Sequence, residues 1–161
     1  MKGCGTAFMS DLDDFDLKIL RRLQGDARLT SDAIGSDVGL SPSAVQRRIK
    51  RLRSIGAVSK EIAVLDPAMV GRPLTIIVQV SVERRRPDVV ESFMKDVRAV
   101  PEIQQCYYVT GEYDFILIFS CKDMSEYERL VQRLFFANEH VHRFQTNVTI
   151  SSVKVGLEVP I

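Results

Sequence analysis

The chain has 161 residues, a mass of 18.2 kDa and a formal net charge of +1, which allows one domain or two small ones with modest cores. Hydrophobic residues make up 45% and charged residues 27% of the chain, and no apolar run approaches the roughly 18–20 residues that span a bilayer, so a membrane-embedded or disordered protein is not expected. Residues 1–10 lack an apolar segment of signal-peptide length, so they are predicted to be a mobile leader and the protein to be cytoplasmic.

The first predicted element is an amphipathic helix from Asp13 to Gln24. Asp13 is suited to cap its N-terminus, and Asp16 places a favourable negative charge in the first turn. The apolar residues recur at spacings of three and four, the period of a helix with one buried face: Phe15, Ile19, Leu20 and Leu23.

A second, short helix is predicted after Thr30, whose hydroxyl can cap it, with Ile34 and Val38 on its buried face. Gly35 lies inside this helix at a propensity cost of about 1 kcal/mol, which suggests close packing at that point. Gly39 follows where the helix must end and turn. In a helix-turn-helix the two helices cross steeply, so these glycines suit the crossing and the turn.

The third predicted helix begins at Ser41-Pro42, with serine as N-cap and proline as its first residue. One narrow apolar stripe forms its inner face: Val45, Ile49 and Leu52. The opposite face is polar or basic, with Ser43, Arg47, Lys50 and Ser54 at its centre and Gln46 and Arg51 on its flanks. Arg48 and Arg53 lie nearer the seam between the two faces.

The stretch from Ser41 to Gly56 carries five basic residues and no acidic one. Many basic helices are simply solvated, but these usually interleave acids at i,i+4 for mutual support. Five like charges are unfavourable unless an anion neutralises them. Residues 1–72 carry 12 Lys and Arg against 9 Asp and Glu, whereas residues 73–161 carry 10 against 12. The basic excess therefore lies in the first part of the chain, and a phosphate backbone is the favoured partner.

These features predict a DNA-binding helix-turn-helix in residues 11–60, with the third helix as recognition helix. Short polar side chains suit base edges, and basic side chains suit phosphates or guanines. The predicted DNA-binding residues are Ser41, Ser43, Gln46, Arg47, Lys50 and Arg51. Double-stranded promoter DNA is the predicted partner, bound by a dimer because one helix reads only one half-site.

Residues 61–73 are predicted to connect two domains. A short strand around Ile62 and Val64 is expected to lead out of the DNA-binding unit. The segment DPAMVGRP then supplies two prolines and one glycine in eight residues, a composition typical of a domain boundary.

Residues 74–161 have the pattern of a second domain. Strands are predicted at 74–83, 103–109, 113–121 and 144–153, and helices at 87–100 and 125–137. The order βαββαβ predicts a ferredoxin-like sheet with both helices on one face, which makes the whole chain an α+β protein. The other face needs a cover, and a second copy of the chain is predicted to supply it.

Three segments, in this order, resemble the Lrp/AsnC or feast/famine family of transcription regulators: LDDFDLKIL, VGLSPSAVQRRIKRLRSIGAV and VTGEYDFIL. The resemblance extends from about Leu12 to Leu157. It implies an N-terminal helix-turn-helix domain, winged-helix-like, that binds promoter DNA. It also implies a C-terminal ferredoxin-like domain of RAM type that dimerises, assembles dimers into rings such as octamers, and senses an amino acid or similar metabolite.

The sequence departs from the family pattern in two places. Residues 33–35 read Ala-Ile-Gly where an E-L-A-like run is common in the family. Asn147 and Thr149 stand where the leucine-responsive branch carries a tyrosine and a valine, which argues against leucine itself as the effector.

By this resemblance, an effector pocket is expected between dimers. A glycine-bearing turn with free backbone groups and a nearby aspartate together suit the carboxylate and ammonium of an amino acid. The predicted turn residues are Thr110, Gly111, Glu112, Tyr113 and Asp114, and the residues predicted to line the side-chain end are Phe136, Thr146 and Val148. The alternative for Asp114 is a structural role, in which it caps or pins the turn.

Enzymatic and metal-binding functions find little support. The motifs GxSxG, HExxH, GxGxxG and the P-loop are absent from the sequence, so neither an enzyme nor a cofactor is predicted. His140 and His142 lack cysteine or carboxylate partners at ligand spacing, so no metal site is predicted. Three cysteines without CxxC spacing fit free thiols in a reducing compartment. Two alternatives stay open: a metabolite-binding oligomer without specific DNA readout and, less favoured, a small enzyme dependent on Asp114.

Overall fold

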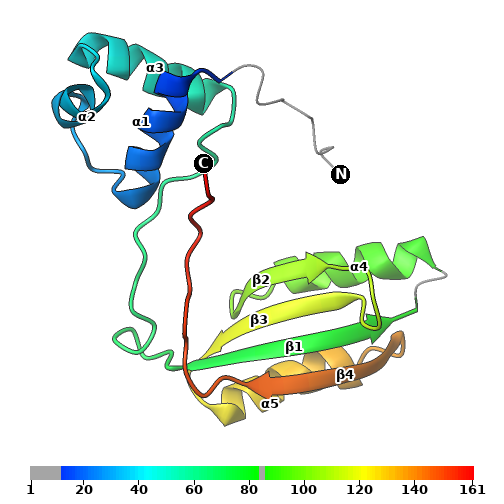
Figure 1. The fold of residues 1–161 in the computed structure, drawn as a ribbon. Helices are drawn as coiled ribbons and strands as arrows, with labels where there is room; N and C mark the ends of the chain where they lie inside the picture. The colour runs from blue at the N-terminus through cyan, green and yellow to red at the C-terminus, as the bar shows by residue number, and fades with distance from the viewer. Residues whose placement is uncertain (1–11, 84–85) are drawn as a thin grey trace. The chain divides into compact units, whose positions relative to one another are not determined.

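The computed structural model describes residues 12–83 and 86–161; the predicted mobile leader, residues 1–10, lies outside them. The chain divides into two compact units (Figure 1). The first contains the chain up to residue 63 together with Val155–Ile161, and the second is Val64–Lys154. No helix in the described ranges is long and apolar enough to cross a membrane.

The first unit is built from three helices: α1 (Asp14–Gly25), α2 (Ser31–Val38) and α3 (Pro42–Ser54). The predicted N-caps are confirmed, since Asp13, Thr30 and Ser41 each accept a hydrogen bond from the backbone N–H three residues later. The predicted apolar faces meet in one core, made of Ile19, Leu23, Ile34, Val38, Val45, Ile49 and Leu52. Phe15 departs from this pattern because it is 37% exposed.

The turn between α2 and α3 explains both glycines. A Cβ atom on Gly35 would lie 2.5 Å from the carbonyl oxygen of Leu40, and the N–H groups of Gly39 and Leu40 both donate to the Gly35 carbonyl, at 2.9 and 3.0 Å. Gly39 has φ of 77°, the left-handed conformation that glycine adopts most readily. The predicted close packing at Gly35 is therefore present, but its partner is the backbone of the turn and not a crossing helix.

The connection that follows α3 differs from the prediction. Residues 59–66 have no regular secondary structure, so the short strand expected around Ile62 and Val64 is wrong. Both side chains are exposed, at 53% and 87%. A strand needs neighbouring backbone groups to satisfy its own, and in this chain no described segment pairs with residues 59–66.

The second unit has the predicted βαββαβ order. Its elements are β1 (Leu74–Val82), α4 (Pro87–Arg98), β2 (Ile103–Tyr108), β3 (Phe115–Cys121), α5 (Met124–Val131), the π-helical turn η2 (Gln132–Phe136) and β4 (Val141–Val148). The strands form one antiparallel sheet in the order β2-β3-β1-β4, which is the ferredoxin-like arrangement. The predicted single helix over 125–137 ends in η2, and the last strand begins earlier than predicted.

Both helices cover one face of this sheet (Figure 1). Alternate residues of β1 and β3 point into the core beneath α4 and α5, among them Val78, Phe115 and Phe119. The residues between them lie on the other face, where Ile77 stands opposite Ile118 and Gln79 opposite Ile116. These isoleucines are only half-buried in the single chain.

The end of the chain belongs to the first unit. The side-chain amide of Gln24 donates to the carbonyl of Val159 at 3.0 Å and accepts from its N–H at 3.1 Å. Arg21, one turn earlier on α1, donates to the carbonyl oxygen of Ile161. The predicted second domain spans residues 74–161, whereas in the structure Val155–Ile161 groups with the helices of the first unit.

Candidate nucleic-acid interface and effector loop

The N-terminus of α3 holds the two serines predicted to contact DNA. The Ser41 hydroxyl accepts from the N–H of Ala44 at 3.3 Å, and it lies 3.2 Å from the hydroxyl of Ser43. In this structure Ser41 therefore acts as the N-cap of α3. Ser43 is exposed at the start of α3.

The outer face of α3 presents the polar residues predicted for DNA. Gln46, Arg47 and Lys50 are exposed, on the side away from the buried stripe of Val45 and Ile49. Within residues 12–83 and 86–161, neither Arg47 nor Lys50 forms an ion pair. This face thus offers an amide and two cations to solvent.

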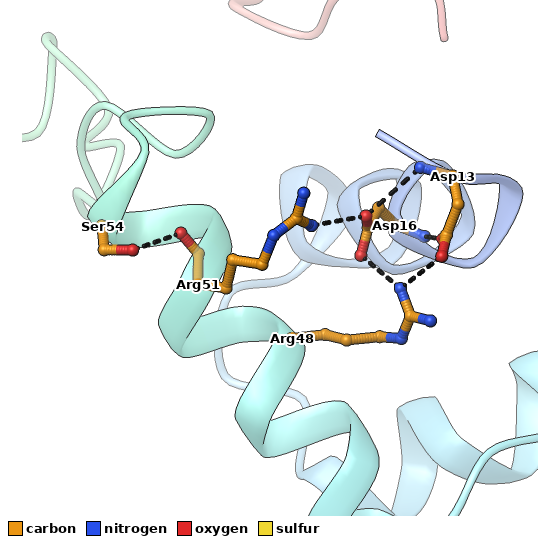
Figure 2. A network of polar contacts seen from close by, with 5 residues as sticks. All are labelled: Asp13, Asp16, Arg48, Arg51 and Ser54. Carbon is orange, nitrogen blue, oxygen red and sulfur yellow. Dashed lines mark hydrogen bonds and ion pairs between the residues drawn. The ribbon is translucent and has the colours of Figure 1, made fainter. Parts of the chain in front are cut away.

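Two other arginines of α3, Arg48 and Arg51, face α1 (Figure 2). Arg48 donates through Nη1 to Asp13 Oδ2 at 2.7 Å and to Asp16 Oδ1 at 2.8 Å. Arg51 donates through Nη1 to Asp16 Oδ2 at 2.8 Å, and its carbonyl accepts from the Ser54 hydroxyl. The carboxylate of Asp16 is almost completely buried, with 1% of its surface exposed. The predicted contact of Arg51 with DNA therefore competes with an ion pair inside the protein.

These ion pairs correct the expectation that the basic run needs an external anion. Arg48 and Arg51 are neutralised by carboxylates of the α1 N-terminus, and Arg53 pairs with Glu61 at 2.7 Å. These acids lie outside α3, so the i,i+4 spacing within the helix does not indicate them. Only two of the five charges, those of Arg47 and Lys50, stand without an ion pair in the described structure.

Two members of the network, Asp13 and Arg48, have pKa values shifted in the direction that favours their charged forms. The pKa of Asp13 is lowered, first because its carboxylate accepts from the backbone N–H of Asp16 and second because it accepts from Arg48. The pKa of Arg48 is raised by its hydrogen bonds to Asp16 and then to Asp13.

The predicted effector loop lies between β2 and β3, and Asp114 pins it to β1. Gly111 has φ of 136°. Asp114 is 2% exposed, and its Oδ2 accepts from the N–H of Val82 at 2.9 Å. Its own N–H donates to the Val80 carbonyl at 2.9 Å, and its carbonyl accepts from the N–H of Val109 at 2.8 Å. The structural role left open for Asp114 is therefore present.

Two residues of this loop contact β4, in a pairing that is not among the predicted contacts. Glu112 Oε1 accepts from Arg143 Nη2 at 2.6 Å, and the Tyr113 hydroxyl donates to Gln145 Oε1 at 2.9 Å. The guanidinium of Arg143 also lies 4.7 Å from the centre of the Tyr113 ring. Because Arg143 and Gln145 alternate along β4, their spacing of two was the only signal in the sequence that they share a face.

The three residues predicted for the side-chain end of the effector lie elsewhere in this chain. Thr146 hydrogen-bonds through its hydroxyl to Tyr127 of α5, and Phe136 packs edge-on against Phe144 with ring centres 5.4 Å apart. These contacts are on the helix-covered face, whereas Glu112 and Tyr113 meet the opposite face of β4.

The strand register further separates Val148 from the effector loop. Val148 stands opposite Ile76 near the start of β1, and the effector loop bonds to the far end of that strand. One chain alone therefore does not bring the eight predicted residues into one pocket.

Two further features of the second unit bear on ligand binding. A cavity of about 420 Å³ opens between α4 and β2, with Met94, Arg98 and Cys106 among its lining residues. None of these lining residues is among those predicted to bind an effector. In the part of the chain that the structure describes, no group of three or more His, Cys, Asp or Glu side chains could hold a metal ion. His140 instead has Nδ1 3.3 Å from a carboxylate oxygen of Glu83.

Each of the two units matches a known protein family. Residues 12–53 match the AsnC-type helix-turn-helix domain, and residues 75–159 match the Lrp/AsnC ligand binding domain. An uncharacterised HTH-type transcriptional regulator of Sinorhizobium fredii is 45% identical over 154 residues, which is 96% of this chain and 91% of that protein. The leucine-responsive regulatory protein of Haemophilus influenzae is 35% identical, over 89% of this chain and 86% of that protein.

Solved structures resemble the chain over nearly its whole length. A transcriptional regulator of Neisseria meningitidis, crystallised as a complex with L-Met, has a TM-score of 0.87 and 33% identity, covering 92% of this chain and 96% of the other. An AsnC family transcriptional regulator of Agrobacterium tumefaciens has a TM-score of 0.86 and 27% identity, with coverage of 92% and 97%.

Proposed function

The chain belongs to the Lrp/AsnC family of transcriptional regulators, and on that premise we propose that it binds promoter DNA through the outer face of α3 under the control of a small metabolite. The family is one of regulators and not of enzymes. The observation that carries the proposal for DNA is the pair Arg47 and Lys50, exposed and without ion pairs among the described residues. Gln46 and Ser43 lie beside them as candidates for base edges.

Substitution of these two cations tests the DNA interface. Arg47→Gln with Lys50→Gln should weaken binding to the DNA upstream of the protein's own coding region. It should also flatten the dependence of log K on log salt by about 0.9 for each phosphate that a subunit no longer neutralises. A matched control removes two exposed cations of the second unit, Lys95→Gln with Arg133→Gln. If both double variants bind like wild type, the assignment of this face is wrong.

We propose that the functional form is a homodimer, which assembles further into rings such as octamers. Ile77, Ile116 and Ile118 lie on the sheet face without helices and are half-buried in one chain, so a second sheet face would remove them from water. In sedimentation, Ile118→Lys should weaken the dimer. The control Lys122→Ile, a change of opposite charge at an exposed position, should not. A monomeric wild type would refute the dimer.

An amino acid or a related metabolite is the proposed effector, bound between dimers. The neighbour from Neisseria meningitidis was crystallised with L-Met, and the predicted pocket residues of this chain lie on opposite faces of β4, which favours a site completed by another subunit. Thermal-shift screening of the common amino acids identifies the ligand, since one present at 100 times its Kd stabilises by about 2.7 kcal/mol.

A variant that keeps the loop intact is needed to place the effector. Asp114 is unsuitable because its carboxylate holds the backbone of Val82. Thr110 is exposed, so Thr110→Val should reduce the ligand-induced shift while leaving the ligand-free melting temperature unchanged. An unchanged response to ligand would place the pocket elsewhere.

The alternative is a metabolite-binding oligomer without specific DNA readout, and the internal pairing of Arg48, Arg51 and Arg53 favours it, because it leaves fewer cations for phosphates. Electrophoretic mobility shift with the upstream DNA separates the two functions. A shift at moderate salt that survives excess random DNA eliminates the alternative. We place the protein in the cytoplasm, together with its promoter DNA.

A further inference from the structure

Asp16 is the most deeply buried of the described charged residues of the first unit, and its side chain faces the proposed recognition helix from α1. With 1% of its surface exposed, its carboxylate accepts from three donors among the described residues: the N–H of Asp13 at 3.3 Å, Arg48 at 2.8 Å and Arg51 at 2.8 Å. A carboxylate removed from water is costly to leave unpaired, so loss of these contacts would destabilise the folded unit.

The pairing with Arg51 removes a cation from the DNA-binding face. At about 100° per residue, Arg51 projects from α3 only about 40° away from Arg47, so its position alone would make it a phosphate ligand. Its guanidinium instead extends towards α1 and meets Asp16 (Figure 2). Arg48 is held in the same way and also pairs with Asp13.

The cluster therefore separates four of the five basic residues into two pairs. Arg48 and Arg51 are neutralised inside the unit, whereas Arg47 and Lys50 face solvent without an ion pair in the described ranges. Phosphate contacts bind every sequence alike, and base contacts distinguish sequences. Binding to random DNA depends mainly on cations that contact phosphates. A smaller number of available cations therefore lowers the affinity for random DNA more than it lowers the binding free energy from base contacts.

We propose that Asp16 is a specificity-determining residue of this regulator, which keeps two arginines of α3 from phosphates and so limits binding to random DNA. The proposal rests on the proposed DNA-binding function. In the DNA complex, Arg48 and Arg51 retain Asp16 as their partner, and the discrimination between operator and random DNA depends on that retention.

Asp16→Asn removes the charge and keeps the shape of the side chain. It should steepen the salt dependence of random-duplex binding by about 0.9 for each arginine released per subunit. Affinity for random DNA should rise more than affinity for the upstream DNA, so their ratio should fall. The matched control is Asp14→Asn, an exposed aspartate on the same turn that lacks an ion pair within residues 12–83 and 86–161. It changes the net charge equally and should leave the slope unchanged.

A second pair of variants keeps the test decisive if Asp16→Asn does not fold. Arg51→Gln should leave the wild-type salt slope unchanged, whereas Arg47→Gln should lower it by about 0.9 per subunit. Equal reductions of the slope by both variants would overturn the proposal, and so would an Asp16→Asn slope equal to that of Asp14→Asn. A wild-type protein without salt-dependent DNA binding would refute the proposed function itself, a result distinct from either of these.

Discussion

Replacement of Gly35 by alanine should destabilise the helix-turn-helix, although alanine is the better helix former. The new Cβ would lie 2.5 Å from the Leu40 carbonyl oxygen, where ordinary contact begins at 3.4 Å, so the two must separate by about 0.9 Å. The obstacle is backbone, and this backbone also carries the hydrogen bond from Leu40 to the Gly35 carbonyl. Overpacking of this kind costs about 1–3 kcal/mol, against a propensity gain of about 1 kcal/mol.

Gly25→Ala is the matched control. Gly25 also lies within a helix, at the end of α1, but a Cβ there would meet no atom within 4 Å. This change should be neutral or stabilise by up to about 1 kcal/mol. Native-state hydrogen exchange of peptides from α2 and α3 measures the first unit separately from the second.

The two alanine variants are expected to move in opposite directions. Faster exchange in α2 and α3 for Gly35→Ala, with slower or equal exchange for Gly25→Ala, is the expected result. Equal behaviour of both variants would show that the turn yields to the added methyl without cost, and the steric reasoning would then be refuted.

Three further predictions concern the thiol of Cys121 and the carboxylates of Asp114 and Asp13. Burial raises the pKa of the Cys121 thiol to about 11, so in a Cys4→Ser background alkylation at pH 8 should modify the exposed Cys106 well before Cys121, as peptide mass spectrometry would show; equal rates would contradict the burial. Asp114→Ala should lower the stability of the second unit by about 1–3 kcal/mol, because the N–H of Val82 loses its acceptor; an unchanged thermal unfolding curve would argue against this. The pKa of Asp13 is lowered in the folded state from an ordinary value of 3.8, so its contribution to stability is present above that value and is lost as the pH falls through the folded pKa. Urea unfolding between about pH 5 and pH 2 should therefore show a weaker pH dependence in Asp13→Asn than in wild type.

The helices and strands could be predicted because their signals are local. Periods of 3.6 and 2 residues, the caps at Thr30 and Ser41, and the glycine that ends α2 all act within a few residues of one another. The same reasoning failed for residues 59–66, where apolar alternation around Ile62 predicted a strand. Periodicity shows which residues could share a face, but a strand also requires a neighbour to pair with.

The polar contacts of the candidate site could not be predicted from local patterns. Asp16 and Arg51 are 35 residues apart, and Glu112 and Arg143 are 31 apart. Each pair forms only after two elements have packed in a particular register, and the sequence contains no periodic signal for that. The predicted apolar and polar faces of α3 were correct, yet they could not show that Arg51 bends towards a carboxylate on another helix.

The return of Val155–Ile161 to the first unit means that the chain crosses between the units twice. The second crossing begins after β4, the strand that contains Thr146 and Val148. It ends where Val159 forms hydrogen bonds with Gln24 of α1. A fragment that ends at residue 63 would therefore lack part of its own unit, and a single proteolytic cut in residues 59–66 would leave the helices attached to the sheet.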